Sequence, residues 1–418
     1  MATRRDAVRS GDIKALTGLR IVAAVWVVLF HFRPLLRDAV PGFLDALTPV
    51  LNCGAQGVDL FFILSGFVLT WNYLDRMGRA WSTRATLHFL WLRLARVWPV
   101  YLVTLHLAAL WVIFTLHVGH IPSQEIYRFT AISYVRQVLL TQLWFQPFFD
   151  NSSWDGPAWS ISAEWLAYLL FGLLVLVIFR MARATRARNL VWLAVAASLP
   201  PVMSLLVTGQ FYTPWSWLPR IVMQFTAGAL VAAAVSRLRL TDRGRRAAGY
   251  SSVMMIAGIA GFLYWSDAHP LHGVSDTGGL VDILFVPLVL TLAIGTGSLP
   301  ALLSTRPAVY GGQISFCLYM VHELVHTCWI WTAQQFDLTM SGKDGKLLLS
   351  AVLAVTLLAA AGLYHAVEEP ARLWMRRMVG DGRPIVDTDA APHGSGGKLQ
   401  AIDGSHDGRP KSVSARAG

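Results

Sequence analysis

Charged side chains are scarce in this chain. Asp, Glu, Lys and Arg make up 14% of its 418 residues, whereas hydrophobic residues make up 55% and the mean hydropathy is +0.50. Soluble domains carry about a quarter charged residues, which excludes an ordinary soluble protein. The alternating ten-residue segments of a transmembrane β-barrel are also absent. Because a membrane-spanning chain must satisfy its backbone groups internally, we predict an all-α, polytopic transmembrane helical bundle.

Other features are rare or missing. The cysteines Cys53, Cys317 and Cys328 form no short-spaced pair, which argues against a disulfide framework or a zinc site. No metal-ligand spacing such as HExxH occurs, so we expect no metal and no bound cofactor. The first apolar segment lacks a small-residue cleavage site and is predicted to be a retained span. Despite the net charge of +11, we expect no nucleic-acid binding, since no basic domain lies outside the apolar segments.

Apolar windows predict about ten spans, because ~20 residues of helix are needed to cross ~30 Å of hydrocarbon. Arginines cluster in every second connection. By the positive-inside rule, those connections and both termini are expected in the cytoplasm. We expect a multi-pass protein of the cell membrane, in contact with the lipid bilayer. The predicted spans are 18–36, 56–74, 97–118, 160–179, 190–208, 218–236, 250–266, 279–298, 310–334 and 346–367.

The chain divides into three parts. Residues 1–15 are predicted to be a cytoplasmic segment, 16–378 the transmembrane domain, and 379–418 a disordered cytoplasmic tail rich in Gly, Ser, Asp and Pro. The longest outer connection, 119–159, is rich in aromatic residues and is expected at the membrane interface or over a cavity. No internal repeat is visible, which argues against a transporter built from inverted repeats.

Ionisable residues inside spans are costly and point to function. Arg20 and His31 are eleven residues apart, so they project from one helix face about 16 Å apart along the axis. An interfacial arginine and a capping histidine would explain this pair alone. Asp59 and Glu164, however, enter their spans near the same end as His31, which favours an aqueous or substrate-filled cavity where a carboxylate orients an imidazole base. Further polar groups at membrane depth are Ser65, Ser160, Ser162, Ser315 and His322.

Arg93 and Arg96 are three residues apart and therefore neighbours on one helix face, just before Pro99. Two interpretations are open. They are ordinary positive-inside anchors, or they form an anion site with Arg20, because guanidinium groups match phosphate geometry bidentately. The second interpretation indicates a phosphorylated donor that feeds a reaction inside the membrane.

The ionisable and polar residues named above lie within seven short sequence blocks. These blocks and their order resemble those of the acyltransferase 3 family. The resemblance covers about Leu16 to Arg372, and the seven blocks together are specific although each one alone is not. The blocks are LTGLRIVAAVWVVLFH, GVDLFFILSGFVLT, RLARVWPVY, WSISAEW, RIVMQFTAGALV, ISFCLYMVHELV and VEEPAR.

This resemblance implies roles for individual residues. His31 would be the catalytic histidine and Arg20 its motif partner, Arg93 and Arg96 the donor-binding pair, and Glu164 a further functional acid. The Glu368–Pro370 motif would be structural. The first block, LTGLRIVAAVWVVLFH, is similar to that of actinobacterial members that act on macrolides and glycolipids. Other pocket candidates are Ser65, Tyr101, Ser160, Ser162, Arg220, Ser315, Tyr319 and His322.

We therefore expect a membrane O-acyltransferase that uses acyl-CoA, with acetyl-CoA favoured, as co-substrate. The acceptor would be a hydroxyl of a sugar, a cell-envelope glycan or glycolipid, or a macrolide-like natural product. His31 would act as general base, assisted by Asp59 or Glu164. The rival class is a secondary transporter that uses Arg20, Asp59 and Glu164 as an ionisable relay, and a non-catalytic scaffold is a third.

Overall fold

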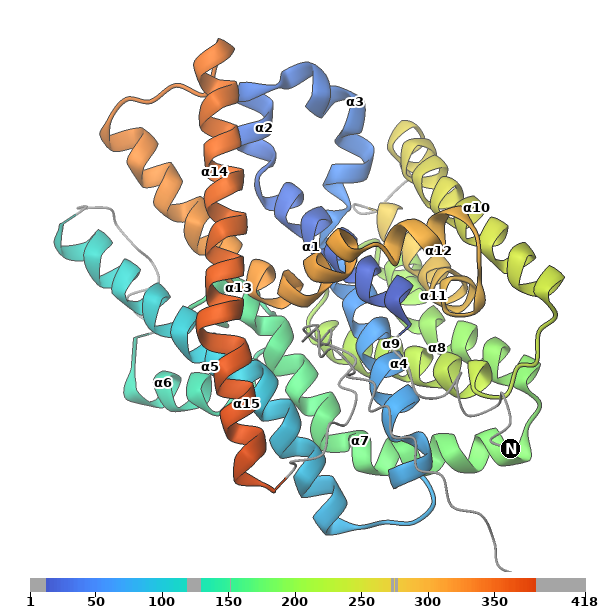
Figure 1. Ribbon diagram of the computed structural model, residues 1–418. Coiled ribbons are helices and arrows are strands. Elements are labelled where there is room, and N and C mark those ends of the chain that lie inside the picture. Colours follow the sequence, from blue (N-terminus) through green and yellow to red (C-terminus); the bar gives the residue numbers. More distant parts are fainter. Residues whose placement is uncertain (1–12, 119–128, 151, 272–273, 275–276, 381–418) are drawn as a thin grey trace, which may run out of the picture.

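The structure is a computed structural model that describes residues 13–118, 129–150, 152–271, 274 and 277–380. These residues form helices and connections and contain no β-strand, which confirms the predicted all-α class (Figure 1). Residues 381–418 of the predicted tail and 1–12 of the 1–15 segment lie outside the described residues, as do residues 119–128 and 151 of the aromatic connection.

The order of elements follows the chain. It runs α1 (Lys14–His31), α2 (Arg33–Ala39), α3 (Pro41–Asn52), η1 (Gly54–Gln56), α4 (Gly57–Met77), α5 (Thr83–His117), α6 (Ala131–Val138), η3 (Gly156–Ala158), α7 (Trp159–Ala184), α8 (Ala187–Thr208), α9 (Trp217–Val235), α10 (Asp242–Ala268), η4 (Thr277–Leu284), α11 (Phe285–Ile294), α12 (Ser298–Leu303), α13 (Arg306–Gln335), α14 (Gly342–Leu363), η5 (Tyr364–Glu368) and α15 (Glu369–Met378).

The predicted spans coincide with long helical segments. Among the described residues, 9 such segments are long and apolar enough to cross a membrane. The predicted span 310–334 lies within α13, which has 30 residues but is not among those nine. Its sequence contains Gln, Ser, Tyr, His and Glu, and its buried residues include Gln313, Ser315 and His322. A polar helix of this kind is tolerated in a membrane only when its polar face is turned toward other helices or a cavity.

Two of the boundaries that differ from the prediction bear on the candidate site. The first span ends at His31, after which the short helices α2 and α3 follow, instead of continuing to residue 36. Helix α5 begins at Thr83, capped by the Ser82 side chain, and runs for 35 residues. No Gly or Pro interrupts the stretch before Pro99, so the helix extends well before the apolar window that marks the span. Arg93 and Arg96 therefore lie on this continuous helix, as expected, but before the apolar window that marks the span.

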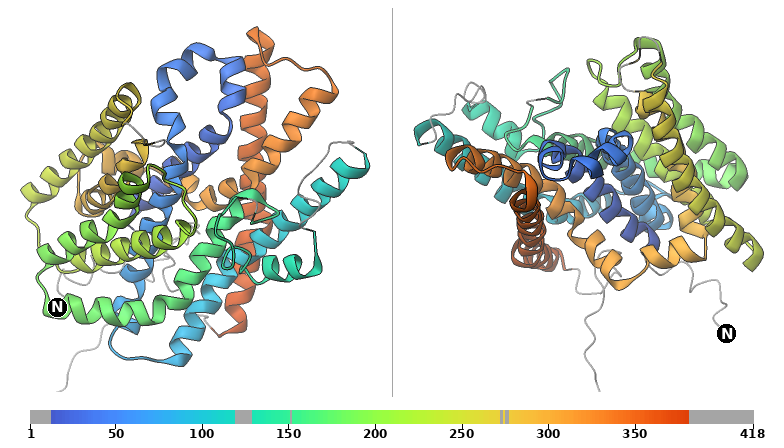
Figure 2. Two further views of the ribbon diagram at one scale, coloured as in Figure 1. Left: turned by 180° about the vertical axis from the view of Figure 1, so that it is seen from behind. Right: turned by 90° about the horizontal axis from the view of Figure 1, so that it is seen from above.

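Helices α1 and α4 occupy the middle of the bundle. Helices α5, α13, α14 and α15 lie to one side of them and helices α8 to α12 to the other, in the front view and from above (Figures 1 and 2). Helix α15 packs along α5, where the Trp91 indole N–H donates to the Met375 carbonyl oxygen at 2.8 Å. The basic start of α5 and the basic end of α15 therefore lie at one end of the bundle.

Glycines allow the central helices to approach closely. A Cβ atom on Gly66 of α4 would lie 1.9 Å from the Phe225 carbonyl oxygen of α9, and one on Gly228 of α9 would lie 1.9 Å from the Ile63 carbonyl oxygen of α4. Helices α1 and α13 approach each other in the same way, because a Cβ on Gly312 of α13 would lie 1.9 Å from the Thr17 carbonyl oxygen of α1. Small residues at such contacts are typical of helix packing in lipid, where dispersion forces rather than the hydrophobic effect hold helices together.

We predict that Gly66→Ala lowers the thermal stability of the detergent-purified protein. The added methyl group meets backbone rather than a flexible side chain, so α4 and α9 must separate, which costs at least about 1–3 kcal/mol. Gly258→Ala is the matched control, because a Cβ on Gly258 in α10 has nothing within 4 Å. The control should be neutral or stabilising by up to ~1 kcal/mol. Equal unfolding temperatures for the two variants would contradict the packing argument.

Candidate active site

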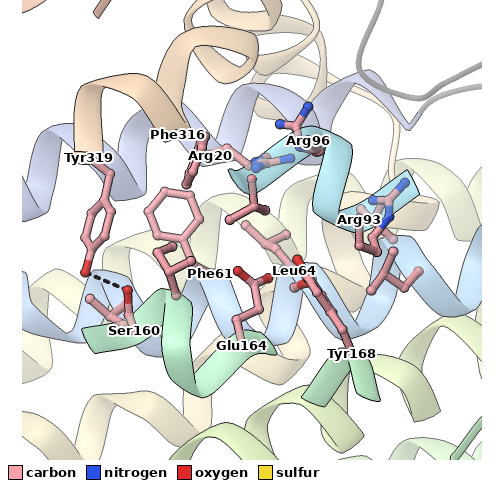
Figure 3. Close-up of a pocket in the computed structure, with 16 residues that line it drawn as sticks. Arg20, Phe61, Leu64, Arg93, Arg96, Ser160, Glu164, Tyr168, Phe316 and Tyr319 are labelled. Carbon is pink, nitrogen blue, oxygen red and sulfur yellow. Dashed lines mark hydrogen bonds between the residues drawn. The ribbon is translucent and has the colours of Figure 1, made fainter. Parts of the chain in front are cut away.

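Five helices of the bundle line one pocket of about 80 Å³ (Figure 3). Seven of the residues singled out from the sequence meet there. They are Arg20 from α1, Ser65 from α4, Arg93 and Arg96 from α5, Ser160 and Glu164 from α7, and Tyr319 from α13.

The charges in this pocket are unequally distributed. The side chains of Arg20, Arg93 and Arg96 lie along one side, and the Glu164 carboxylate points into the pocket from the opposite side (Figure 3). Three guanidinium groups against one carboxylate make the lining cationic. In an apolar bundle the local dielectric constant is low, so such a lining attracts an anionic ligand more strongly than it would at a water-exposed surface.

Arg96 is held by an acid from the last helical segment. Its Nη1 atom lies 3.2 Å from Oε1 of Glu368, a carboxylate that is completely buried. Oε2 of Glu368 accepts a hydrogen bond from the Cys317 thiol at 3.1 Å. Glu368 ends a π-helical turn, and such turns often occur at functional sites. Arg96 is thus a buried, paired side chain and not an exposed anchor, and the Cys317 thiol donates to the same carboxylate.

A hydrogen-bonded pair closes the end of the pocket away from Arg93. The Tyr319 hydroxyl lies 2.8 Å from the Ser160 hydroxyl and 2.9 Å from the Pro157 carbonyl oxygen (Figure 3). Helix α7 begins at Trp159, directly after η3, so Ser160 is fixed in its first turn. The Tyr319 hydroxyl thus joins α13 to the first turn of α7 and to η3, and this contact forms one wall of the pocket.

His31 lies beyond that wall, next to His322. Its Nδ1 atom is 2.9 Å from the Val27 carbonyl oxygen and 3.3 Å from Nε2 of His322. The ring of His322 lies in turn 5.8 Å from that of Tyr319, measured between centroids. His31 is half-buried whereas His322 is completely buried. The predicted catalytic histidine is therefore linked to the pocket through two residues of α13.

For two neutral rings, these contacts determine which nitrogen carries the hydrogen. Nδ1 of His322 lies 2.6 Å from the Tyr319 carbonyl oxygen, which can only accept, so this nitrogen carries the hydrogen and Nε2 has the lone pair. Nδ1 of His31 then faces two acceptors, Nε2 of His322 and the Val27 carbonyl oxygen. It must carry a hydrogen as well. The lone pair of His31 is consequently on Nε2, the atom that would take a proton from a substrate.

A carboxylate close to His31 belongs to Glu323, which was not among the residues selected from the sequence. A nitrogen of His31, a nitrogen of His322 and a carboxylate oxygen of Glu323 all lie within 4.8 Å of one another. Glu323 also contacts His326, whose Nδ1 is 3.4 Å from its Oε1. The signal that could have identified Glu323 is its position: it follows His322 directly inside a predicted span, where an acid is costly.

Asp59 has a different partner from the one expected. Both of its oxygens receive Arg220, with Nε at 3.1 Å and Nη2 at 2.6 Å, and Asp59 is completely buried. The guanidinium carbon of Arg220 also lies 4.8–5.4 Å from the ring centroids of Phe211, Tyr212 and Trp159. The structure thus corrects the expected arrangement: Asp59, Glu164 and His31 do not form one cluster, and Asp59 is occupied by an ion pair.

Three further candidates lie outside the pocket with partners of their own. Ser162 donates to the Leu140 carbonyl oxygen at 2.8 Å, and Ser315 donates to the Gly312 carbonyl oxygen at 2.8 Å. Tyr101 donates to Oε1 of Gln137 at 3.0 Å, within a buried contact between α5 and α6. These interactions connect helices or satisfy polar groups within them, so the structure supports a packing role for each of the three.

The fold and the site together define a multi-pass membrane protein with a cationic internal pocket next to a histidine of fixed tautomer. The model of the acyltransferase 3 family, described as an acyltransferase domain, matches residues 13–367. The chain belongs to this family, and it is a membrane acyltransferase.

Two curated relatives agree with this assignment. The chain is similar to acyltransferase MdmB of Streptomyces mycarofaciens, with 27% identity over 412 residues, covering 91% of this chain and 97% of that protein. It is also similar to protein 2 in the picA locus of Rhizobium radiobacter, with 31% identity over 186 residues, or 44% of this chain and 89% of that protein. No solved structure matches the chain.

We predict that Asp59→Asn destabilises the protein because it leaves the Arg220 charge buried without its counter-ion. Removing one partner of a buried ion pair costs about 3–5 kcal/mol. The measurement is the thermal unfolding temperature in detergent. The double variant Asp59→Asn/Arg220→Gln should recover part of the loss, since no uncompensated charge remains. If the single variant kept wild-type stability and lost only activity, Asp59 would belong to the catalytic machinery after all.

Proposed function

We propose that the protein transfers a short acyl group from acyl-CoA, with acetyl-CoA as the expected donor, to a hydroxyl group of an acceptor. The observation that carries this proposal is the pairing of a cationic pocket with a histidine whose Nε2 lone pair is held available by its neighbours. The expected acceptors are a sugar, a cell-envelope glycan or glycolipid, and a macrolide-like compound. The expected location is the cell membrane, with both termini in the cytoplasm.

The donor half of the proposal rests on the arginines. CoA carries phosphate groups, and guanidinium groups bind phosphate through paired hydrogen bonds. Arg20, Arg93 and Arg96 come from two helices and converge on one pocket, which supports a common anionic ligand.

The chemical step assigns each proton. The acceptor hydroxyl gives its proton to Nε2 of His31 while its oxygen attacks the thioester carbonyl carbon. The carbon–sulfur bond then breaks, the ester is released, and the proton on Nε2 passes to the CoA thiolate. His322 and the Val27 carbonyl oxygen hold the Nδ1 hydrogen of His31 throughout. The alternative route, through an acyl group on Nε2 of His31, uses the same lone pair.

The first test is acyl transfer from radiolabelled acetyl-CoA to a panel of hydroxyl acceptors by the detergent-purified protein. An enzyme retains this activity without a membrane gradient, whereas a transporter shows none. His31→Ala should reduce the rate by at least about 10²–10⁴-fold, the usual contribution of a general base. His106→Ala is the control, because His106 is exposed, is not among the residues that line the pocket, and hydrogen-bonds the Leu102 carbonyl oxygen and the Tyr134 hydroxyl. Near wild-type turnover by His31→Ala would refute the assigned role.

The second test separates phosphate binding from topology. Arg93→Lys keeps the charge but loses the planar fork, so the apparent affinity for acyl-CoA should weaken roughly ten-fold or more, at about 1.4 kcal/mol per lost contact. The acceptor KM should change little. Arg84→Lys, on the same helix but outside this pocket, is the matched control. If both Arg93→Lys and Arg96→Lys left the donor KM unchanged, the arginines would return to an anchoring role.

A further inference from the structure

The three residues at the end of α1 and in the middle of α13 have the composition of a metal site. Two imidazole nitrogens, from His31 and His322, and one carboxylate oxygen, from Glu323, lie within 4.8 Å of one another. The sequence showed no metal-ligand spacing because the first of these residues precedes the second by 291 positions. Only the packing of α1 against α13 brings them together.

The distance between the two histidines suits a small transition-metal ion, and the Glu323 carboxylate, within 4.8 Å of both, would complete the set after a small movement. Nδ1 of His31 and Nε2 of His322 are 3.3 Å apart. Two nitrogen ligands of a tetrahedral Zn²⁺ ion, each bound at about 2.0–2.1 Å, stand ~3.3–3.4 Å apart. His322 shares one feature with metal-bound histidines: its other nitrogen donates to the Tyr319 backbone carbonyl, which leaves the Nε2 lone pair for the ion in place of the His31 hydrogen.

Buried polar atoms around Glu323 give an independent sign of a missing ligand. Oε2 of Glu323 and Nε2 of His326 are buried and, among the described residues, have no hydrogen-bond partner. Such atoms cost free energy unless an ion or water satisfies them. Asp155 is also buried, and its carboxyl group interacts electrostatically with that of Glu323. Two acidic side chains therefore lie near the cluster. A cation would satisfy the carboxylate oxygen and offset both acids.

We propose that His31, His322 and Glu323 bind a divalent transition-metal ion, Zn²⁺ being the best fit, with a fourth position left for water. Two imidazoles and one carboxylate are ligands that Zn²⁺ accepts, whereas Mg²⁺ and Ca²⁺ prefer oxygen ligands alone. His326 serves as the neighbour that holds the carboxylate, at 3.4 Å from Nδ1 to Oε1.

Metal binding would switch off the base, a consequence that rests on the function proposed above. Coordination uses the lone pair of Nδ1 of His31, the atom that carries hydrogen in the metal-free arrangement. The ring hydrogen must then move to Nε2, which can no longer accept a proton from the acceptor hydroxyl. The bound ion is therefore an inhibitor of the acyl transfer and not a participant in it.

The test uses the full-length protein in detergent, freed of metal by a chelator and titrated with Co²⁺ and then Zn²⁺. Co²⁺ in a tetrahedral site should produce visible absorption that Zn²⁺ abolishes. Glu323→Gln and His322→Gln should each weaken Zn²⁺ binding by at least about ten-fold. Unfolding temperature shows whether each variant is folded, and the conservative Glu323→Gln decides the result if His322→Gln does not fold. His365→Gln is the matched control, because His365 forms a similar pair with Glu369, at 3.6 Å, elsewhere on the chain.

Three outcomes decide between the inferences. Zn²⁺ binding that is lost in Glu323→Gln and kept in His365→Gln supports the site, and inhibition of acyl transfer over the same concentration range supports the switch. Absence of the Co²⁺ spectrum, or equal Zn²⁺ affinity in Glu323→Gln and wild type, overturns the site. A metal-free protein that binds Zn²⁺ normally but shows no acyl transfer would retain the metal site and contradict the proposed function instead.

Discussion

The structure depends on one constraint: an ionisable group inside an apolar bundle must have a partner there. Arg220 and Asp59 satisfy each other across α9 and α4, and Arg96 and Glu368 do so between α5 and the π-helical turn. Both pairs are buried, so separating the charges of either pair is costly. These two pairs therefore fix how α4, α5 and α9 are rotated, and that rotation determines which side chains are directed into the pocket.

The constraint also separates the polar residues into two kinds. Asp59 and Arg220 are directed at each other, so their charges are largely cancelled within the protein. The pocket has three arginines and one glutamate, and Glu368 offsets only part of that excess. Three cationic side chains thus gather at one place in an apolar interior, and an arrangement so costly is expected where a ligand of opposite charge enters.

The spans and much of the pocket could be predicted from the sequence. Apolar length identifies membrane helices reliably, because the bilayer thickness sets it, and arginines or acids within such a helix stand out at once. Partners could not be predicted in this way. Asp59 and Arg220 are 161 residues apart, and the contact between His31 and Glu323 depends on how α1 and α13 are rotated against each other. Helix periodicity shows which residues share a face, but it does not show which helix that face meets.

The start of α5 illustrates a related limit. Hydropathy marks the part of a helix that crosses hydrocarbon, whereas the helix itself continues as long as its backbone has no reason to end. The two criteria differ by more than ten residues between Thr83 and the predicted start of the span at residue 97. Arg93 and Arg96 lie between these two positions. They are therefore outside the apolar window but on the helix, and their side chains line the pocket inside the bundle.

The π-helical turn at Tyr364–Glu368 has a consequence for how this chain can vary in length. Such a turn contains one residue more than an α-helical turn, and the surplus rotates everything after it by about 100°. Losing a single residue there would restore a regular helix and turn Glu368 away from Arg96, while the face that α15 presents to α5 would shift by the same angle. The last helical segment therefore tolerates exchange of residue types far better than it tolerates a deletion, and its register is part of the site although it lies some 200 residues from α7 in the chain.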